Sequence, residues 1–213
     1  MKQPAGRLLA VGDIHGCLKP LQQLMNQVAP KEEDQIVFLG DYIDRGPDSR
    51  GVIDYLLNFH DRWPQTVFLK GNHEAMLLDF VAGREQLLYL LNGGETTLFS
   101  YREEGRLQIP EAHLQFLHSL RLYFETDQYL FVHAGLRPEI PIENQSEEDL
   151  LWIREEFLSS AYRWGKTVVF GHTPMPKPHL TTDRIGLDTG AVYGYTLSCC
   201  DVERRKIWTV PAS

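Results

Sequence analysis

The stretch Gly40-Asp41-Tyr42-Ile43-Asp44-Arg45-Gly46 decides the fold prediction, because it lies between an apolar run and an amphipathic segment. The apolar run covers residues 35–39, and apolar residues recur at helical spacing over residues 49–59. A short apolar run, a polar loop containing glycine and a helical pattern, in this order, are typical of a βα unit. We therefore expect this stretch to be a loop at the carboxyl end of a strand.

The same order of elements occurs twice more within the first 81 residues. Gly12-Asp13-Ile14-His15-Gly16 follows the apolar run 7–11 and precedes a helical pattern over 18–28. Gly71-Asn72-His73-Glu74 follows the run 66–70 and precedes a helical pattern over 75–81. Alternating strands and helices predict a parallel sheet, in which ligands bind beyond the carboxyl ends of the strands. All three loops fall at that position.

The rest of the chain predicts a helical insertion and a half that is richer in strands. Residues 83–120 have helical patterns and are expected to form a small insertion or cap, and residues 145–159 predict an acidic helix with Ser146 as its N-cap. Further strands are predicted over residues 122–125, 129–133, 167–170, 185–188, 195–200 and 206–210. No linker separates two halves, so we expect a single α/β domain over residues 1–213, with two β-sheets flanked by helices.

The composition excludes several classes of protein. The 21 Lys and Arg residues against 29 Asp and Glu residues give a net charge of −8, which disfavours a general nucleic-acid binder. No apolar run approaches the length of a membrane span, so no membrane partner is expected. Three cysteines (Cys17, Cys199 and Cys200) make a disulfide framework improbable and favour a cytoplasmic protein with buried thiols. A phosphate substrate is still compatible with the acidic balance, because bound divalent metal ions reverse the local charge.

Six residues of metal-ligand type directly follow five apolar runs. They are Asp13, His15, Asp41, Asn72, His133 and His172. One such residue alone is better explained as a turn former or helix cap, but six at equivalent positions indicate a metal site. The set contains no cysteine, which disfavours structural zinc, and mixed oxygen and imidazole ligation suits manganese, iron or zinc in a catalytic site. Six ligands are too many for one ion with open positions and suit two ions ~3.5–4 Å apart with a bridging carboxylate.

Five blocks together resemble the signature of the PPP family of metallophosphatases. They are the three loops quoted above, His133-Ala134-Gly135 and Gly171-His172-Thr173, and their order and spacing are similar to the family's over residues 8–195. The similarity is greatest to the compact bacterial and phage branch of serine/threonine protein phosphatases. It implies a calcineurin-like metallophosphoesterase sandwich of two β-sheets with helices outside.

The resemblance also implies a role for each site residue. Asp13, His15 and Asp41 correspond to ligands of a first divalent metal ion, and Asp41, Asn72, His133 and His172 to ligands of a second, with manganese as the first choice and iron or zinc as alternatives. A hydroxide shared by the two ions would attack phosphorus directly. His73 resembles the general acid, Asp44 the carboxylate that orients it, and Arg45, Arg154 and Asn72 the groups that hold phosphate.

The sequence is compatible with more than one role for some residues and with more than one function. Arg154 is either a phosphate ligand or an exposed arginine that pairs with Glu155 or Glu156, and Trp152 and Tyr193 either flank the cleft or belong to the core. The leading function is hydrolysis of phosphoserine or phosphothreonine in proteins, with phosphotyrosine as a further option. The alternative is hydrolysis of dinucleoside tetraphosphates, followed by a generic phosphodiesterase and a non-enzymatic metal-stabilised module.

Two features favour the first of these functions. Asp44 is present, whereas the matching position in symmetrical tetraphosphatases is typically not an aspartate. The residues near Arg154 are acidic (Glu147, Glu148, Asp149, Glu155 and Glu156), a charge that repels a polyanion and attracts a basic phosphopeptide.

Overall fold

The first three strands are parallel and alternate with helices, as the sequence predicts. The computed structural model describes residues 6–212 and places β1 (Leu8–Val11), β2 (Gln35–Phe38) and β3 (Val67–Phe68) side by side. The helices that follow these strands are α1 (Leu18–Val28), α2 (Ser49–Arg62) and α3 (Asn72–Val81). Because the strands are parallel, the three polar loops meet at one edge of the sheet.

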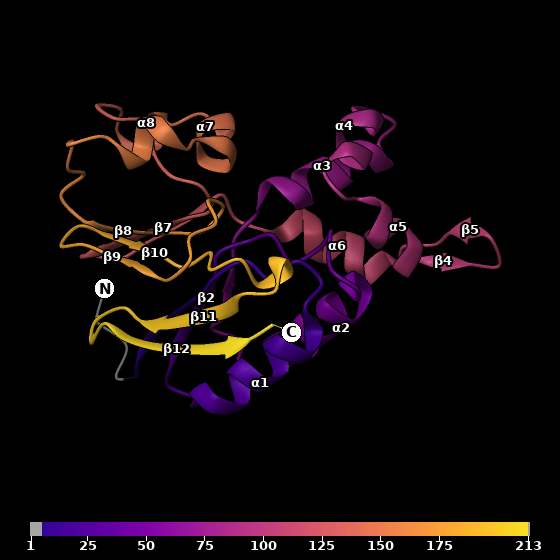
Figure 1. Cartoon of the computed structure of the whole chain (residues 1–213), viewed down its shortest axis with the longest axis horizontal. Coiled ribbons are helices and arrows are strands. Elements are labelled where there is room, and N and C mark those ends of the chain that lie inside the picture. The colour runs from indigo at the N-terminus through magenta and orange to yellow at the C-terminus, as the bar shows by residue number, and fades with distance from the viewer. Residues whose placement is uncertain (1–5, 213) are drawn as a thin grey trace.

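Two five-stranded sheets form the centre of the fold (Figure 1). In the first sheet the order is β12-β11-β1-β2-β3, where β11 (Thr196–Asp201) is antiparallel to both β1 and β12 (Lys206–Pro211). The order in the second sheet is β6-β7-β8-β10-β9. Its strands are β6 (Tyr123–Glu125), β7 (Tyr129–Val132), β8 (Thr167–Phe170), β9 (His179–Leu180) and β10 (Arg184–Gly186). Of these strands, β9 was not predicted.

Alternating side chains give the first sheet two buried faces. In β1, Leu9 and Val11 pack towards the helices, whereas Leu8 and Ala10 belong to the same buried cluster as Phe131 of the second sheet. Such burial on both faces explains why the strands read as continuous apolar runs. The α/β sandwich with helices outside the sheets agrees with the predicted fold class.

The cysteines follow the same alternation. Cys199 lies in the core under the helices and Cys200 in the core between the sheets, so the two neighbours point to opposite faces. Cys17 is buried, and all three thiols are free. Within residues 6–212, none of the helices combines the length and the apolar composition that a membrane crossing requires.

The segment 83–120 is helical for the most part, but it also contains a hairpin that the sequence did not predict. Its helices are α4 (Gln86–Leu91), α5 (Glu95–Ser100) and α6 (Glu111–Ser119). Between α5 and α6, β4 (Arg102–Glu103) and β5 (Arg106–Leu107) form an exposed two-stranded sheet, which projects from the molecule in Figure 1. The strands have only two residues each, too few for a strand pattern to show in the sequence.

The predicted helix over 145–159 is wrong in its length, because the chain forms two short helices there. They are α7 (Glu147–Trp152), after the 3₁₀ turn Ile142–Asn144, and α8 (Glu155–Leu158). Ser146 caps α7 as predicted, with its Oγ accepting a hydrogen bond from the Asp149 backbone at 3.0 Å. The helix stops at Ile153 and Arg154, and the φ of −130° and ψ of −92° at Arg154 are not helical. The break keeps Ile153 buried while Arg154 stays exposed.

Candidate metal centre

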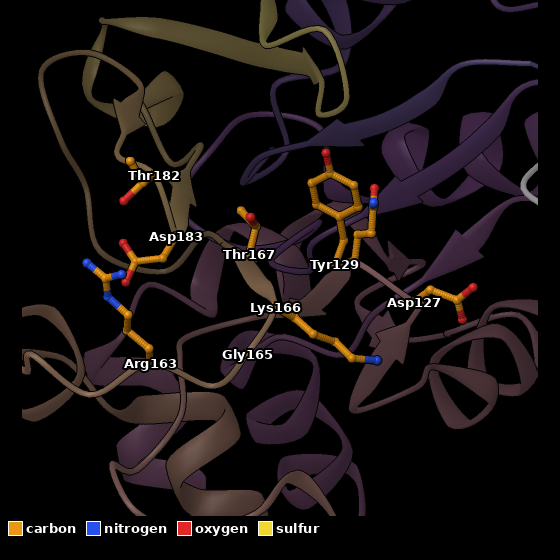
Figure 2. A pocket seen from close by; sticks show the side chains of 9 residues that line it. Asp127, Tyr129, Arg163, Gly165, Lys166, Thr167, Thr182 and Asp183 are labelled. Carbon is orange, nitrogen blue, oxygen red and sulfur yellow. The ribbon is translucent and has the colours of Figure 1, made fainter.

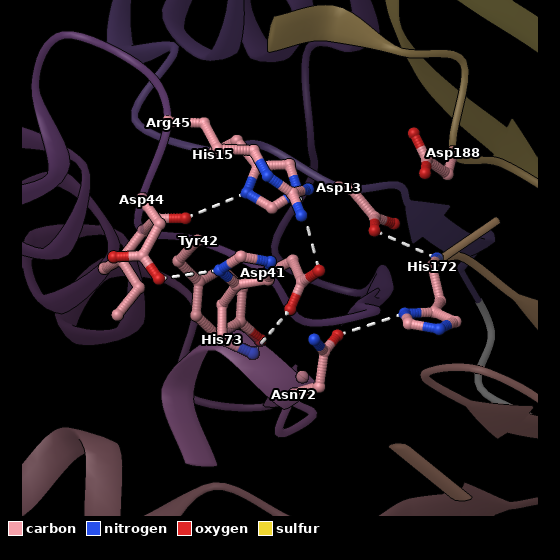
Figure 3. Close-up of polar contacts among 12 residues, drawn as sticks. Asp13, His15, Asp41, Tyr42, Asp44, Arg45, Asn72, His73, His172 and Asp188 are labelled. Carbon is pink, nitrogen blue, oxygen red and sulfur yellow. Dashed lines mark hydrogen bonds and ion pairs between the residues drawn. The ribbon is translucent and has the colours of Figure 1, made fainter. Parts of the chain in front are cut away.

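The six predicted metal ligands converge at the carboxyl ends of five strands, and Figure 3 labels five of them, all but His133. They follow β1, β2, β3, β7 and β8, and every one of their side chains is buried. The set is Asp13, His15, Asp41, Asn72, His133 and His172. Buried polar side chains need partners, so their contacts show what the site can hold.

One group of ligand atoms surrounds the Asn72 side chain. Its Oδ1 lies 3.0 Å from Nε2 of His133 and 3.0 Å from Nδ1 of His172. The Nε2 of His133 is also 3.4 Å from Oδ1 of Asp41. Because Nδ1 of His133 lies 2.9 Å from the Leu39 carbonyl, that nitrogen carries the proton and Nε2 presents a lone pair. A bare nitrogen among carboxylate and amide oxygens is a donor set that a divalent cation fits.

A second group lies on the other side of Asp41. His15 donates its Nδ1 proton to the Ile43 carbonyl at 2.9 Å, which leaves Nε2 bare at 3.5 Å from Oδ2 of Asp41. Asp13 accepts a hydrogen bond from the His172 backbone through Oδ2, whereas its buried Oδ1 has no hydrogen-bond partner. The two oxygens of Asp41 thus face two different ligand groups. Two groups that share Asp41, one with His15 and His73 and one with His133 and His172, bring their ligand atoms close enough that they would hold two divalent ions.

The protonation states agree with metal ligation. Burial lowers the pKa of His15 to about 3 and that of His172 to about 2, and it also lowers the pKa of His133. These imidazoles are therefore neutral near pH 7, the form that binds metals. Burial alone would raise the pKa of Asp41, but the histidines that face it are cationic in the acid range and lower that pKa, so the carboxylate is ionised near pH 7.

His73 lies beside this centre and contacts Asp44 as predicted. Its Nδ1 is 2.6 Å from Oδ2 of Asp44, and both side chains are buried (Figure 3). Burial disfavours the imidazolium, yet Asp41 and Asp44 outweigh it and raise the pKa of His73. The Nε2 atom is buried without a hydrogen-bond partner. This nitrogen is free to donate a proton to a bound molecule.

Both predicted phosphate-binding arginines lie at the centre. Arg45 places Nη1 3.0 Å from Nε2 of His15, and its guanidinium lies 5.9 Å from the ring centroid of Tyr193. Arg154 is exposed, and its Nη1 is 3.4 Å from Oγ1 of Thr173, the residue after His172. Within residues 6–212 Arg154 forms no ion pair, so the alternative pairing with its neighbouring glutamates is absent there.

Two aromatic residues flank the site instead of belonging to the core. Trp152 is 36% exposed and its ring lies edge-on to His172, with the centroids 6.1 Å apart. Tyr193, in the 3₁₀ turn Ala191–Tyr193, is 53% exposed. Both rings are therefore accessible to a bound molecule.

Glu74 holds the loops of the centre together, a role that the sequence prediction missed. Its Oε2 accepts hydrogen bonds from the backbones of Asp41 and Gly71, both at 2.9 Å, and its Oε1 accepts one from Tyr42 at 2.7 Å. Burial and the nearby Asp41 raise the pKa of Glu74 to about 8. The available signal was its place three residues after the N-cap of α3, where a glutamate reaches back to free backbone N–H groups.

Asp188 is a second residue of the site that the sequence did not predict. It is buried near Asp13 and His172 in Figure 3, and its Oδ1 accepts a hydrogen bond from the Gly190 backbone at 3.0 Å. Burial raises the pKa of Asp188 to about 6. It follows β10, so the strand-end rule that identified the six candidate ligands also applied to Asp188.

Backbone strain is concentrated at this site. Non-glycine residues with positive φ include His15 (47°), Asp41 (52°), Asp44 (72°), Arg45 (65°) and His172 (62°). Each such conformation costs about 1–3 kcal/mol and persists only where the surroundings enforce it. At Gly171 a Cβ atom would lie 2.1 Å from Oδ1 of Asp13, so glycine is required beside this carboxylate. The loops hold the ligands in place at the expense of stability.

Comparisons with known proteins agree with this geometry. Serine/threonine-protein phosphatase 1 of Salmonella typhimurium is 32% identical over 205 residues, which cover 91% of this chain and 90% of that protein. The asymmetrical bis(5'-nucleosyl)-tetraphosphatase PrpE of Bacillus thuringiensis is 27% identical over 232 residues, which cover 95% and 93%. A crystal structure described as a putative diadenosine tetraphosphatase has a TM-score of 0.78 at 28% identity and covers 99% of this chain and 96% of that one.

The sequence profile of the calcineurin-like phosphoesterases matches residues 6–199, which contain all five blocks of the centre. The sandwich of two sheets and the convergent ligands fit the same assignment. The chain belongs to the calcineurin-like phosphoesterase family.

Proposed function

We propose that this phosphoesterase is a dinuclear-metal phosphomonoesterase whose substrates are proteins that carry phosphoserine or phosphothreonine. The observation that carries the proposal is the combination of two arginines, Arg45 next to His15 and Arg154 next to Thr173, with the buried His73–Asp44 pair. A monoester has three terminal oxygens, enough for metal ions and two guanidinium groups to bind at once. The 32% identity to a serine/threonine-protein phosphatase supports this choice.

The proposed roles follow from the contacts. Asp13, His15 and Asp41 would hold one ion, and Asp41, Asn72, His133 and His172 the other, with manganese as the preferred metal and iron or zinc as alternatives. A metal pair held there supplies an activated water and neutralises charge that develops on the phosphoryl group. Proton donation to the leaving oxygen and binding of the phosphate oxygens are proposed for side chains of the protein.

His73 is proposed as the general acid. Asp44 accepts the Nδ1 proton, which turns the unpartnered Nε2 towards the leaving oxygen. The raised pKa of His73 keeps this proton available near neutral pH. Arg45, Arg154 and the amide of Asn72 would hold the non-bridging phosphate oxygens, so that the leaving oxygen lies in line with the attacking water.

A dinucleoside tetraphosphate is the second candidate substrate, and specific observations favour it. Two of the relatives named above carry that activity in their names, at 27% and 28% identity. That PrpE is of the asymmetrical type, to which the reasoning from Asp44 about symmetrical enzymes does not apply. The exposed ring of Tyr193 also lies near Arg45, where a base could stack.

Part of the acidic charge near Arg154 is neutralised within the protein. Asp149 forms an ion pair with Arg137, and Glu147 lies 3.4 Å from Lys70. Glu148, Glu155 and Glu156 keep exposed carboxylates. This remaining charge supports a basic phosphopeptide as the partner, though less strongly than the sequence alone indicates.

A substrate panel tests the proposal. We expect a higher kcat/KM for phosphoserine or phosphothreonine peptides with Lys or Arg nearby than for dinucleoside tetraphosphates, at matched metal and salt. The Glu155→Gln/Glu156→Gln double variant should narrow the difference, because it removes charge that attracts the basic peptide. A clear preference for the tetraphosphate in the unmodified protein would assign it to the second function.

A further inference from the structure

Both oxygens of the Asp44 carboxylate have partners, and those of Oδ1 come from the helical segment 86–100. While Oδ2 contacts His73, Oδ1 accepts hydrogen bonds from the Tyr89 hydroxyl at 2.7 Å and from Oγ1 of Thr97 at 2.6 Å. Asp44, Tyr89 and Thr97 are all 0% exposed. In this dry environment the two hydroxyls are strong determinants of how the carboxylate is rotated.

The same segment also holds the backbone around Asp44. The Asp44 N–H lies within hydrogen-bond distance of Oγ1 of Thr97 (2.9 Å) and Oγ of Ser49 (3.0 Å). The Arg45 N–H donates to the Gly93 carbonyl at 3.1 Å. Asp44 and Arg45 both have positive φ, so these bonds secure a strained conformation.

The turn between α4 and α5 lies directly against the site. A Cβ atom at Gly93 would be 2.8 Å from Cγ of Arg45, and one at Gly94 would be 2.5 Å from the ring of Tyr89. At Gly93 the φ of +92° also favours glycine. Because of this close packing, the α4–α5 segment restricts the positions of Asp44 and Arg45.

We propose that Tyr89 and Thr97 are positioning residues for the general acid. They hold Oδ1 of Asp44, so that Oδ2 alone accepts the Nδ1 proton of His73 and Nε2 stays directed at the leaving oxygen. The helical segment thereby contributes to catalysis although neither residue contacts the substrate. This inference rests on the proposed acid role of His73 and is independent of which phosphate ester is the natural substrate.

The main test uses Tyr89→Phe and Thr97→Val, which remove one hydroxyl each and keep the side-chain shape. We expect kcat on a phosphoserine peptide, whose alkoxide leaving group needs a proton, to fall about tenfold for each variant, with KM unchanged. On p-nitrophenyl phosphate, whose leaving group needs little protonation, the loss should shrink to about twofold. An equal loss on both esters, or no loss, would overturn the proposal.

Tyr101→Phe is the matched control. Tyr101 is as buried as Tyr89 and lies in the same insertion, but its hydroxyl lies 2.8 Å from Nδ1 of His113 and not near Asp44. The control should show no dependence on the leaving group, whatever its effect on Tm. If it reproduces the Tyr89→Phe profile, the effect is general loosening of the insertion and the proposal is wrong.

A double-mutant cycle and a spectroscopic readout complete the test. In the Asp44→Asn background, Tyr89→Phe should cost no further activity, because Tyr89 acts through the carboxylate; additive losses would contradict this. Proton NMR should show the His73 Nδ1–H resonance shifted in Tyr89→Phe but unshifted in Tyr101→Phe, and an unshifted Tyr89→Phe signal counts against the proposal. His73→Asn tests the underlying function separately, since a leaving-group-independent defect there refutes the acid role itself.

Discussion

The two ends of strands β7 and β8 differ sharply in chemistry. At the carboxyl ends, His133 and His172 join the buried metal centre. At the amino ends, about 13 Å away for strands of this length, lies an open hollow of about 480 Å³ (Figure 2). Its lining includes Tyr129, Lys166 and Thr167, together with Asp127 and Arg163.

In the hollow, the side chains of Lys166 and Asp183 have polar partners, whereas the metal centre keeps buried polar atoms without partners. Lys166 lies 2.9 Å from Oε1 of Glu125 and donates to the Thr126 carbonyl at 2.6 Å. In the centre, by contrast, Oδ1 of Asp13 and Nε2 of His73 are buried without partners. A surface hollow alone is therefore weak evidence for a functional site. Buried polar groups that converge and still have unused hydrogen-bonding capacity indicate function more directly.

Among variants at the metal centre and in the hollow, Asp41→Asn is expected to have the largest effect on activity and metal content. Because both oxygens of Asp41 face ligand groups, kcat/KM should fall by more than about 10³-fold and bound metal should drop below about two ions per chain. Elemental analysis and steady-state kinetics measure both quantities. Asp127→Asn, in the hollow, is the matched control and should keep both; two ions and near-normal activity in Asp41→Asn would remove the bridging assignment.

His73→Asn should lower kcat by ~10²–10⁴-fold, the usual loss for a general acid, while metal content stays unchanged. The loss should be smaller on aryl phosphates than on phosphoserine, because a good leaving group needs less protonation. Kinetics on both esters and elemental analysis check this. Loss of metal in this variant would mean that His73 is a ligand.

Arg154→Ala should lower kcat/KM by ~10²-fold, the scale for a preorganised charged donor at a site where charge develops. Arg163→Ala removes an exposed arginine from the hollow and should change kcat/KM by less than about twofold. Phosphopeptide kinetics compare the two variants directly. Equal small effects would leave Arg154 as an ordinary surface arginine.

Lys166→Ala should have the smallest effect. Removing its half-exposed ion pair with Glu125 should cost less than about 1 kcal/mol of unfolding free energy, and kcat should be unchanged. Urea denaturation and kinetics measure the two effects. A large loss of activity would show that the amino ends of these strands take part in function after all.

Local rules made the position of the candidate metal ligands predictable from sequence. Asp13, Asp41 and Asn72 each follow a short apolar run, and parallel strands bring such positions to one edge whatever the rest of the fold does. The same rule extends to His133 and His172 in the second sheet. By contrast, the predicted helix over 145–159 failed because its interruption at Ile153 and Arg154 serves tertiary packing, which periodicity does not report.

The sequence by itself therefore predicted the fold class, the six candidate metal ligands and, through the family resemblance, the contact between His73 and Asp44, since each of these residues lies in a recognisable block. Only the tertiary structure decided what surrounds them: Glu74 tying two loops together, and Tyr89 and Thr97 reaching Asp44 from 45 and 53 residues away. Hydrogen bonds between residues so far apart have no periodicity in the chain. The bonds from Tyr89 and Thr97 exist because packing of the α4–α5 segment brings two hydroxyls to Oδ1 of Asp44, an oxygen that burial would otherwise leave unpaired.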